Sequence, residues 1–310
     1  MSEPTADPLP QSTTSSSAPT NIAQANLQAM GYMVVAMGAF VCNDTLMKAT
    51  SDELPLGHMI TLRGIISCLI MLPVVAFTCS LTTPFRVYSW PVFIRNIAEI
   101  GAAFTFLSAL FHLPMADVSG VLQAVPLTIT AAAALLLREQ VGWRRWTASA
   151  VGLVGVLLII RPGTVDFSIW YVVALGAVLC VTTRDLATRF IAKTAPSLAI
   201  TFITALLTML AGLVLATTET YVAPSLTAIV QLTGAGVLVL IAYHSLIQAM
   251  RIGEISAIAP FRYSVVLWAM ILGYLVFGEV PSASTIIGSM IVIAAGLYTL
   301  HRERVTARRA

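Results

Sequence analysis

The sequence contains few charged residues, because Asp, Glu, Lys and Arg make up only 10% of its 310 residues. An ordinary soluble domain carries about 25%, so this chain has too few charges to cover a water-exposed surface. Hydrophobic residues make up 58% of the chain, against roughly 45–50% in soluble domains. The few charges fall mostly between long apolar segments, and this pattern indicates a protein that folds within a lipid bilayer.

Cysteine is also scarce, and the motifs of several chemical classes are missing. The four cysteines lie in or beside apolar segments without CxxC spacing or a neighbouring histidine, so we expect inert thiols and no metal site. The absence of HExxH, of GxSxG with triad partners, of a phosphate-binding glycine loop and of a DxD-type pair argues against an enzyme. We predict no catalytic residue and no cofactor. A net charge of +3 is too small to indicate a nucleic-acid partner.

The sequence does contain a series of long apolar segments. A bilayer core about 30 Å thick needs roughly 20 apolar residues for each crossing helix. Residues 1–28 are polar, and we expect them to form a disordered cytoplasmic tail rather than a signal peptide. The rest of the chain predicts an all-α integral membrane protein of about ten transmembrane helices, at residues 29–49, 57–79, 90–112, 114–137, 143–161, 168–190, 196–217, 227–250, 253–277 and 281–301.

Basic residues are distributed unevenly between the two ends of these helices. If the N-terminus is cytoplasmic, 13 of the 17 Lys and Arg residues lie on the cytoplasmic side, Lys48, Arg63 and Arg161 lie on the other side, and Arg262 lies in mid-helix. Cytoplasmic loops carry such an excess of basic residues. We therefore expect both termini, including a basic tail at residues 302–310, to face the cytoplasm. The predicted location is a plasma membrane, as in a bacterial inner membrane.

The two halves of the chain share a pattern of charges. The series Asp44, Lys48 and Pro55 recurs as Asp, Arg and Pro at an offset of 141 residues, and Glu139 recurs as Glu279 at an offset of 140. Such repeats are common in transporters. Five helices per half is an odd number, so the halves are expected to cross the membrane in opposite directions. The predicted halves are residues 29–161 and 162–301.

Longer segments carry a resemblance to a known family. The run "LLLREQVGWRRWTASAVGLVGVLLI" ends the first half and "YLVFGEVPSASTIIGSMIVIAAGLY" ends the second. Together with the Asp-x-x-x-Lys end of the first helix and Arg63 in the second, these runs resemble the two EamA repeats of the drug/metabolite transporter superfamily. The resemblance implies a five-plus-five inverted repeat around a central cavity. It also implies export or uptake of metabolites such as amino acids, purines, riboflavin or S-adenosylmethionine.

Polar residues deep inside the predicted helices are the candidates for binding a solute. A charge in hydrocarbon costs at least about 2.5–3.5 kcal/mol, so it is expected to face the bundle interior. Helices three and eight, and helices four and nine, correspond in the repeat, so their polar residues are expected to converge at the interface of the halves. The predicted substrate-binding residues are Glu99, Gln123, His244, Gln248, Arg262 and Tyr263.

Several of these residues have two interpretations. Arg262 either holds an acidic group of the solute or forms a permanent ion pair with Glu99. Glu99 either carries a proton during transport or pairs with Arg95 one helical turn away. His244 is either a proton relay or a hydrogen-bonded structural residue.

Charges near the helix ends are predicted to have structural or gating roles. Asp44 with Lys48, and Asp185 with Arg189, stand one helical turn apart and are expected to neutralise each other. Arg63 has no acidic residue one helical turn away, and we predict that it also has a gating role. The glutamates at 139 and 279 are expected to be helix-end or capping residues. Gly152, Gly155, Gly288 and Gly296 are expected to let helices five and ten pack closely.

Together these features predict a secondary transporter that moves a small polar organic metabolite by alternating access, with proton coupling left open. We favour an anionic or zwitterionic metabolite, because basic residues outnumber unpaired acidic residues among the candidates inside the helices. The alternatives are a membrane-embedded enzyme or a structural membrane protein. The expected partners are the solute, the lipid bilayer and, by the family resemblance, a second copy in a homodimer.

Overall fold

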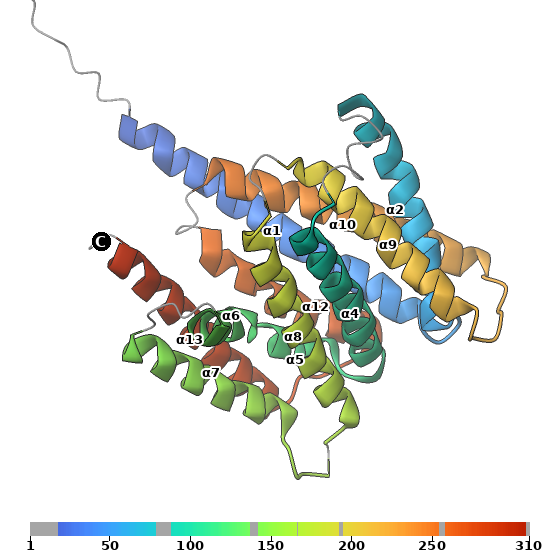
Figure 1. The fold of residues 1–310 in the computed structure, drawn as a ribbon. Coiled ribbons are helices and arrows are strands. Elements are labelled where there is room, and N and C mark those ends of the chain that lie inside the picture. The colour runs from blue at the N-terminus through green and yellow to red at the C-terminus, as the bar shows by residue number, and fades with distance from the viewer. Residues whose placement is uncertain are drawn as a thin grey trace, which may run out of the picture.

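The computed structural model describes residues 18–78, 88–136, 142–165, 167–191, 195–253 and 258–307, and regular structure within these ranges is helical. The helices are arranged in one bundle (Figure 1). Their bounds are α1 Ala18–Thr50, α2 Leu56–Thr78, α4 Trp90–His112, α5 Met115–Leu122, α6 Val125–Leu136, α7 Trp143–Ile160, α8 Ile169–Arg189, α9 Ser197–Ala216, α10 Leu226–Ile252, the 3₁₀ turn η1 Ala259–Tyr263, α12 Ser264–Phe277 and α13 Ala283–Ala307.

The ten predicted membrane segments are confirmed as helices. Within the described ranges, eight helical segments are long and apolar enough to cross a membrane, with α5 and α6 counted as one span. The remaining two, in α7 and α13, contain shorter apolar stretches at Trp146–Ile160 and Ala283–Thr299. Many large apolar side chains are exposed on the outside of the bundle, for example Phe77 and Leu275. Such a surface is suited to lipid.

The first helix begins earlier than predicted. Residues 1–28 were expected to form a disordered tail, but α1 starts at Ala18. The segment 18–28 contains three Ala and two Gln, which are good helix formers. Its polarity correctly excluded it from the apolar core, but polarity does not prevent a helix from continuing beyond the membrane.

Proline breaks the fourth predicted helix into α5 and α6. Pro126 lacks an N–H group and cannot bond to the carbonyl group of Leu122. The backbone instead makes tighter bonds from Gln123 N to Gly120 O and from Ala124 N to Val121 O. The ninth helix starts in a similar way, because Pro260 lies in the 3₁₀ turn η1 before α12.

The helices of the two halves are interleaved. The first helix of each half packs along the third helix of the other half, giving the pairs α1 with α10 and α8 with α4. The second helices, α2 and α9, pack together, as do the fifth helices, α7 and α13. This exchange of equivalent partners is what a two-fold relation between inverted halves produces.

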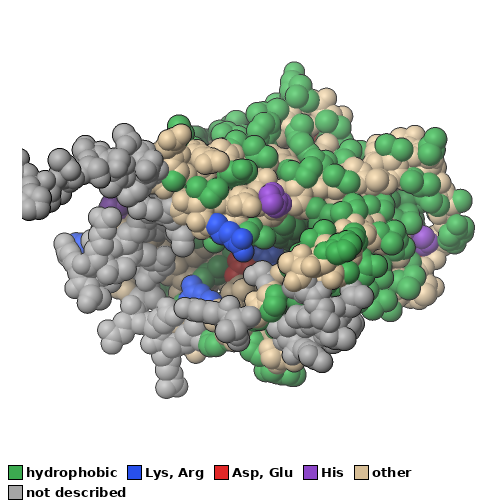
Figure 2. Space-filling view, turned by 90° about the horizontal axis from the view of Figure 1, so that it is seen from above, with side chains coloured by type: hydrophobic (Ala, Val, Ile, Leu, Met, Phe, Trp, Pro, Cys, Tyr) green, Lys and Arg blue, Asp and Glu red, His purple; other side chains and the backbone are tan. Residues whose placement is uncertain are grey.

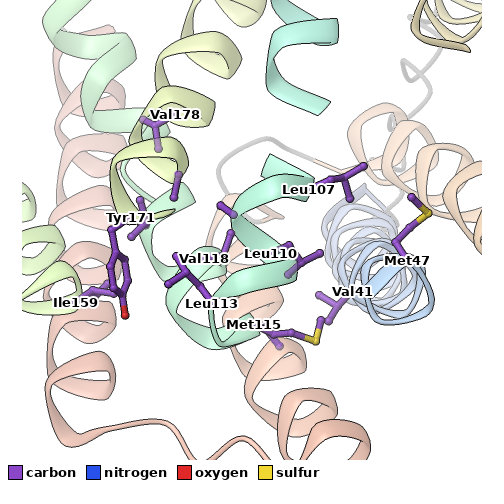
Figure 3. Packing of buried hydrophobic residues seen from close by; sticks show 14 of the residues in the cluster. Val41, Met47, Leu107, Leu110, Leu113, Met115, Val118, Ile159, Tyr171 and Val178 are labelled. Carbon is purple, nitrogen blue, oxygen red and sulfur yellow. The ribbon is translucent and has the colours of Figure 1, made fainter. Parts of the chain in front are cut away.

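Two kinds of packing hold the bundle together. Leu107, Leu110 and Met115 belong to a buried cluster that joins α4 and α5 to α1 (Figure 3). Glycines allow close contact elsewhere: a Cβ on Gly155 would lie 2.8 Å from the carbonyl oxygen of Gly288, and a Cβ on Gly288 would lie 2.6 Å from that of Gly155. The predicted close packing of helices five and ten is confirmed.

Candidate functional site

A cavity of about 110 Å³ lies between α2, α4, α9 and α10. At about 30 Å³ per molecule in the liquid, this volume corresponds to roughly four water molecules. A space-filling view shows a hollow on one face in which basic and acidic side chains meet, on a surface that is otherwise largely apolar (Figure 2). The polar residues that line the cavity are Arg63, Ser67, Arg95, Glu99, Thr201, Thr204, Thr208 and Tyr243.

Arg63 is the cation of the cavity that has the most free hydrogen-bonding capacity. It lies on α2, eight residues into the helix, and is half-buried. Asp44, Glu99 and Tyr243 act on it electrostatically, but in the described part of the chain Arg63 makes no hydrogen bond and no ion pair. A guanidinium group offers five N–H donors in a planar fork that suits a carboxylate. Arg63 can therefore bind an anionic group that enters the cavity.

Glu99 is held in place by an arginine from the other half of the chain. Its Oε2 accepts a hydrogen bond of 3.0 Å from Arg184 Nη1. Arg184 also binds its neighbour Asp185 at 2.8 Å. Because only one oxygen of Glu99 is used in these contacts, the other remains available to a donor in the cavity.

Arg95 is oriented by side chains on α4 and α9. Its Nη1 donates to Thr204 Oγ1 at 2.6 Å, and Thr204 lies 2.7 Å from Asn96 Oδ1, to which it donates. Four further N–H donors of Arg95 are left for solute or water. Tyr243 lies within electrostatic range of Glu99 and of three arginines, Arg63, Arg95 and Arg184. The cavity therefore combines separate cationic and anionic groups with a wall of hydroxyls.

One end of the bundle is joined by polar contacts, and we call it the clamped end. It carries the C-terminal ends of α1, α4, α7, α9 and α12 and the N-terminal ends of α2, α5, α8, α10 and α13. Lys48 Nζ donates to Glu279 Oε1 and to the Leu113 carbonyl, each at 2.6 Å, and Glu279 Oε2 accepts the Met115 N–H at 2.8 Å. Glu279 is thus a capping residue for α5, as predicted, while Glu139 lies outside the described residues.

A second polar network at the clamped end was not identified from the sequence. Asp117 is almost completely buried, and it accepts hydrogen bonds from Tyr171 on α8 and Thr285 on α13. Ser282 continues the network to Arg161, whose Nη2 donates to it at 2.6 Å. An acidic residue in the first turn of an otherwise apolar segment was the available signal. Because Asp117 lies near the start of the predicted helix 114–137, a search for polar residues deep inside the helices does not select it.

A third contact at this end joins α2 to the turn after α9. Both carboxylate oxygens of Glu219 lie 3.0 Å from the Gly57 N–H, and Oε2 lies 3.1 Å from His58 Nδ1. We call this contact the Glu219 clamp. Nearby, Glu53 accepts hydrogen bonds from the backbone and side chain of Ser225, at the start of α10.

The six predicted substrate-binding residues do not converge. Glu99 lines the cavity, whereas His244 and Arg262 are exposed. Tyr263 is buried against Gly296. Gln123 lies at the break between α5 and α6, near the carbonyl group of Ser119, and Gln248 is half-buried near the end of α10. His244 does not face the cavity because successive side chains on a helix are rotated by about 100°. Tyr243, the residue before it on α10, faces the cavity, so His244 points away.

Several expected ion pairs are replaced by contacts between helices. Glu99 pairs with Arg184 rather than with Arg262 or Arg95. Lys48 pairs with Glu279 rather than with Asp44, and Asp44 accepts a hydrogen bond from Asn43. Asp185 pairs with its neighbour Arg184, and Arg189 lies at the end of α8. For Glu99 and Lys48, partners on other helices satisfy charges that helix packing removes from water, whereas Asp44 and Asp185 each bond to an adjacent residue on their own helix.

Comparison with known proteins identifies relatives over nearly the whole length. The chain is 25% identical to the S-adenosylmethionine uptake transporter of Rickettsia felis, and 25% identical to the riboflavin transporter of Vibrio cholerae. Each match covers 91% of this chain and 96% of the relative. The pseudopaline exporter of Pseudomonas aeruginosa is 23% identical over 84% of this chain and 92% of its own.

A solved crystal structure has the same fold, with a TM-score of 0.62 and 19% identity over 90% of this chain and 97% of that one. The EamA-like transporter family matches residues 27–161 and 168–300, the two halves of the repeat. This multi-pass membrane protein, with two EamA domains, therefore belongs to the EamA-like transporter family.

Proposed function

We propose that this chain is a secondary transporter of a small anionic or zwitterionic organic metabolite, and that the solute binds in the central cavity. The observation that carries the proposal is Arg63, a guanidinium group in the cavity with no hydrogen bond or ion pair among the described residues. A charge that is even half-buried is costly without a partner. A solute carboxylate would supply the missing partner, while Glu99 and the hydroxyl of Tyr243 would face its donor groups.

The proposal also covers the orientation of the chain in the membrane, the movement of its halves and the group that carries a proton. Both termini face the cytoplasm, because basic residues gather on that side. Movement occurs by rocking of the two halves around the cavity. Glu99 is the candidate proton carrier, because it lines the cavity and one of its oxygens remains free. His244 is a weaker candidate because it is exposed outside the cavity.

The test begins with ligand binding to the purified protein. A solute that binds only the folded state raises its apparent stability, so thermal unfolding is screened with amino acids, nucleobases, riboflavin and S-adenosylmethionine. The stabilisation is expected to disappear in Arg63→Gln and to persist in Arg262→Gln, a matched loss of one exposed guanidinium. Stabilisation that survives Arg63→Gln would place the site elsewhere.

Transport is then measured in proteoliposomes with the solute found by the screen. If Glu99 carries a proton, an imposed pH gradient drives accumulation in the unmodified protein, and Glu99→Gln abolishes that dependence while binding persists. Uptake that ignores the gradient in the unmodified protein removes the proton from the mechanism and leaves the solute site intact.

A further inference from the structure

The helices α2 and α9 are in close contact at the clamped end, and farther along the pair the cavity lies beside them. At the clamped end, a Cβ on Gly212 would lie 2.7 Å from Ile60 Cγ2, and a Cβ on Gly57 would lie 2.6 Å from the backbone nitrogen of Ala216. This contact leaves no space for a solute. Toward the other end, Met71 of α2 and Thr201 of α9 both line the cavity. For the cavity to open at the clamped end, α2 and α9 must part there.

The Glu219 clamp crosses the contact that would have to part. Glu219 lies three residues after Ala216, the last residue of α9, and its carboxylate holds the backbone of Gly57 and the side chain of His58 in the first turn of α2. The side chains of His58 and Glu219 are 13% and 18% exposed, so water screens their interaction only partly. Opening at this end breaks these hydrogen bonds.

We propose that the Glu219 clamp is a pH-sensitive latch that holds α2 and α9 together at the clamped end and that weakens when His58 loses its proton. The proposal rests on transport by alternating access, but it does not depend on which solute is carried. A protonated imidazole donates a charge-assisted hydrogen bond, which is roughly twice as strong as a neutral one. The latch is therefore strong at low pH and weaker at high pH.

Protons reach His58 from the clamped end and not through the central cavity. A second cavity of about 360 Å³ lies beside the clamp, and His58, Thr217 and Tyr221 are among its lining residues. The central cavity has a different set of lining residues that does not include His58. The latch would therefore respond to the pH on one side of the membrane only.

Among the charged groups near His58, Glu219 is the one that contacts its imidazole. Tyr221 presents its ring to the imidazole at 5.8 Å between centroids. The other acidic groups near this end of α2 are Asp52 and Glu53, and Glu53 is engaged with Ser225. The neighbouring helices α4 and α10 bring one ionisable group to this end, His112, which stacks on Trp170.

The test measures the distance between the turn that leads into α2 and the turn that follows α9, which increases when the two helices part. Spin labels are attached to Asp52→Cys and Thr218→Cys, two exposed positions on either side of the contact, in the full chain with its four native cysteines replaced by serine. The reconstituted protein is compared at about pH 5.5 and about pH 8.5, on either side of the range in which imidazoles titrate. We expect the population with the longer label distance to rise about two- to fivefold at high pH, as the loss of a partly exposed ion pair implies.

The variant His58→Gln is the matched control. Glutamine keeps a neutral donor for Glu219 but cannot gain a proton, so its label distances are expected not to change with pH. Equal populations at both pH values in the reference protein, or the same pH response in His58→Gln, would overturn the latch. No solute is present, so failure of the proposed solute site would appear only in the binding screen and not in this measurement.

Discussion

The clamped end of α2 and α9 has an opposite end, toward which the cavity extends, and we call it the cavity end. The two ends are equivalent in the repeat but are built differently. Gly57 and Gly212 give close backbone contact at the clamped end, whereas their equivalents at an offset of 141, Leu198 and Met71, are large side chains. Thr78 stands at the position equivalent to Glu219. The clamped end can therefore close more tightly than the cavity end. An inverted repeat provides two similar conformations, and the differences between its halves determine which one is more stable.

Removing Lys48, the cation that binds Glu279, is expected to have the largest effect on stability at the clamped end. Lys48→Met leaves a carboxylate that is 20% exposed without its ion-pair partner. Breaking a fully buried pair costs 3–5 kcal/mol, so this partly exposed pair is expected to cost about 2 kcal/mol of unfolding free energy. Thermal unfolding in detergent measures the loss. The double variant Lys48→Met with Glu279→Gln should recover part of it, and a double variant no more stable than the single one contradicts the paired role.

Adding one methyl group at the crossing of α2 and α9 is the next test. In Gly212→Ala the new Cβ meets Ile60 at 2.7 Å, so the helices must shift, at a cost of about 1–3 kcal/mol. In the control Gly176→Ala, the nearest atom is Thr105 Cγ2 at an ordinary contact distance of 3.7 Å. Melting temperatures of the two variants should therefore separate. Equal values would mean that the crossing is looser than the structure indicates.

A smaller effect is expected at the cavity end. Thr204→Val removes the hydroxyl that orients Arg95, and a net hydrogen bond contributes about 0.5–1.5 kcal/mol. Solute affinity is expected to fall about two- to tenfold, as titration calorimetry would measure. Thr204→Ser restores the hydroxyl and should restore affinity. If the valine variant binds normally, Arg95 does not contribute to solute binding.

The smallest effect is expected outside both regions. His244→Ala and Arg262→Ala change exposed side chains, and such substitutions usually alter stability by less than about 0.5 kcal/mol. Solute affinity and melting temperature should stay at the level of the unmodified protein. A large loss of transport in either variant, with binding unchanged, would point to a role in another conformation.

The sequence was informative about helices and less so about the faces they present. Long apolar segments and prolines located the ten helices, although the effect of Pro126 on the fourth was not anticipated. Depth brought attention to Glu99, which lines the cavity. In a membrane helix, however, both the lipid side and the interior side are apolar, so periodicity does not show which side faces inward. The sequence therefore does not show which of two adjacent residues, such as Tyr243 and His244, faces the cavity. For the same reason it does not identify partners on distant helices, such as Arg184.

The interleaved pairing of the helices also affects the order in which the protein can be completed during synthesis. Glu99 emerges from the ribosome 85 residues before Arg184, its partner on α8, and α1 must wait still longer for α10. The first half therefore enters the membrane with a carboxylate that has no cation and with helices that lack their main neighbours. Neither half is an independent folding unit, and the newly made chain remains an unfinished assembly until its tenth membrane segment, α13, the partner of α7, has been inserted.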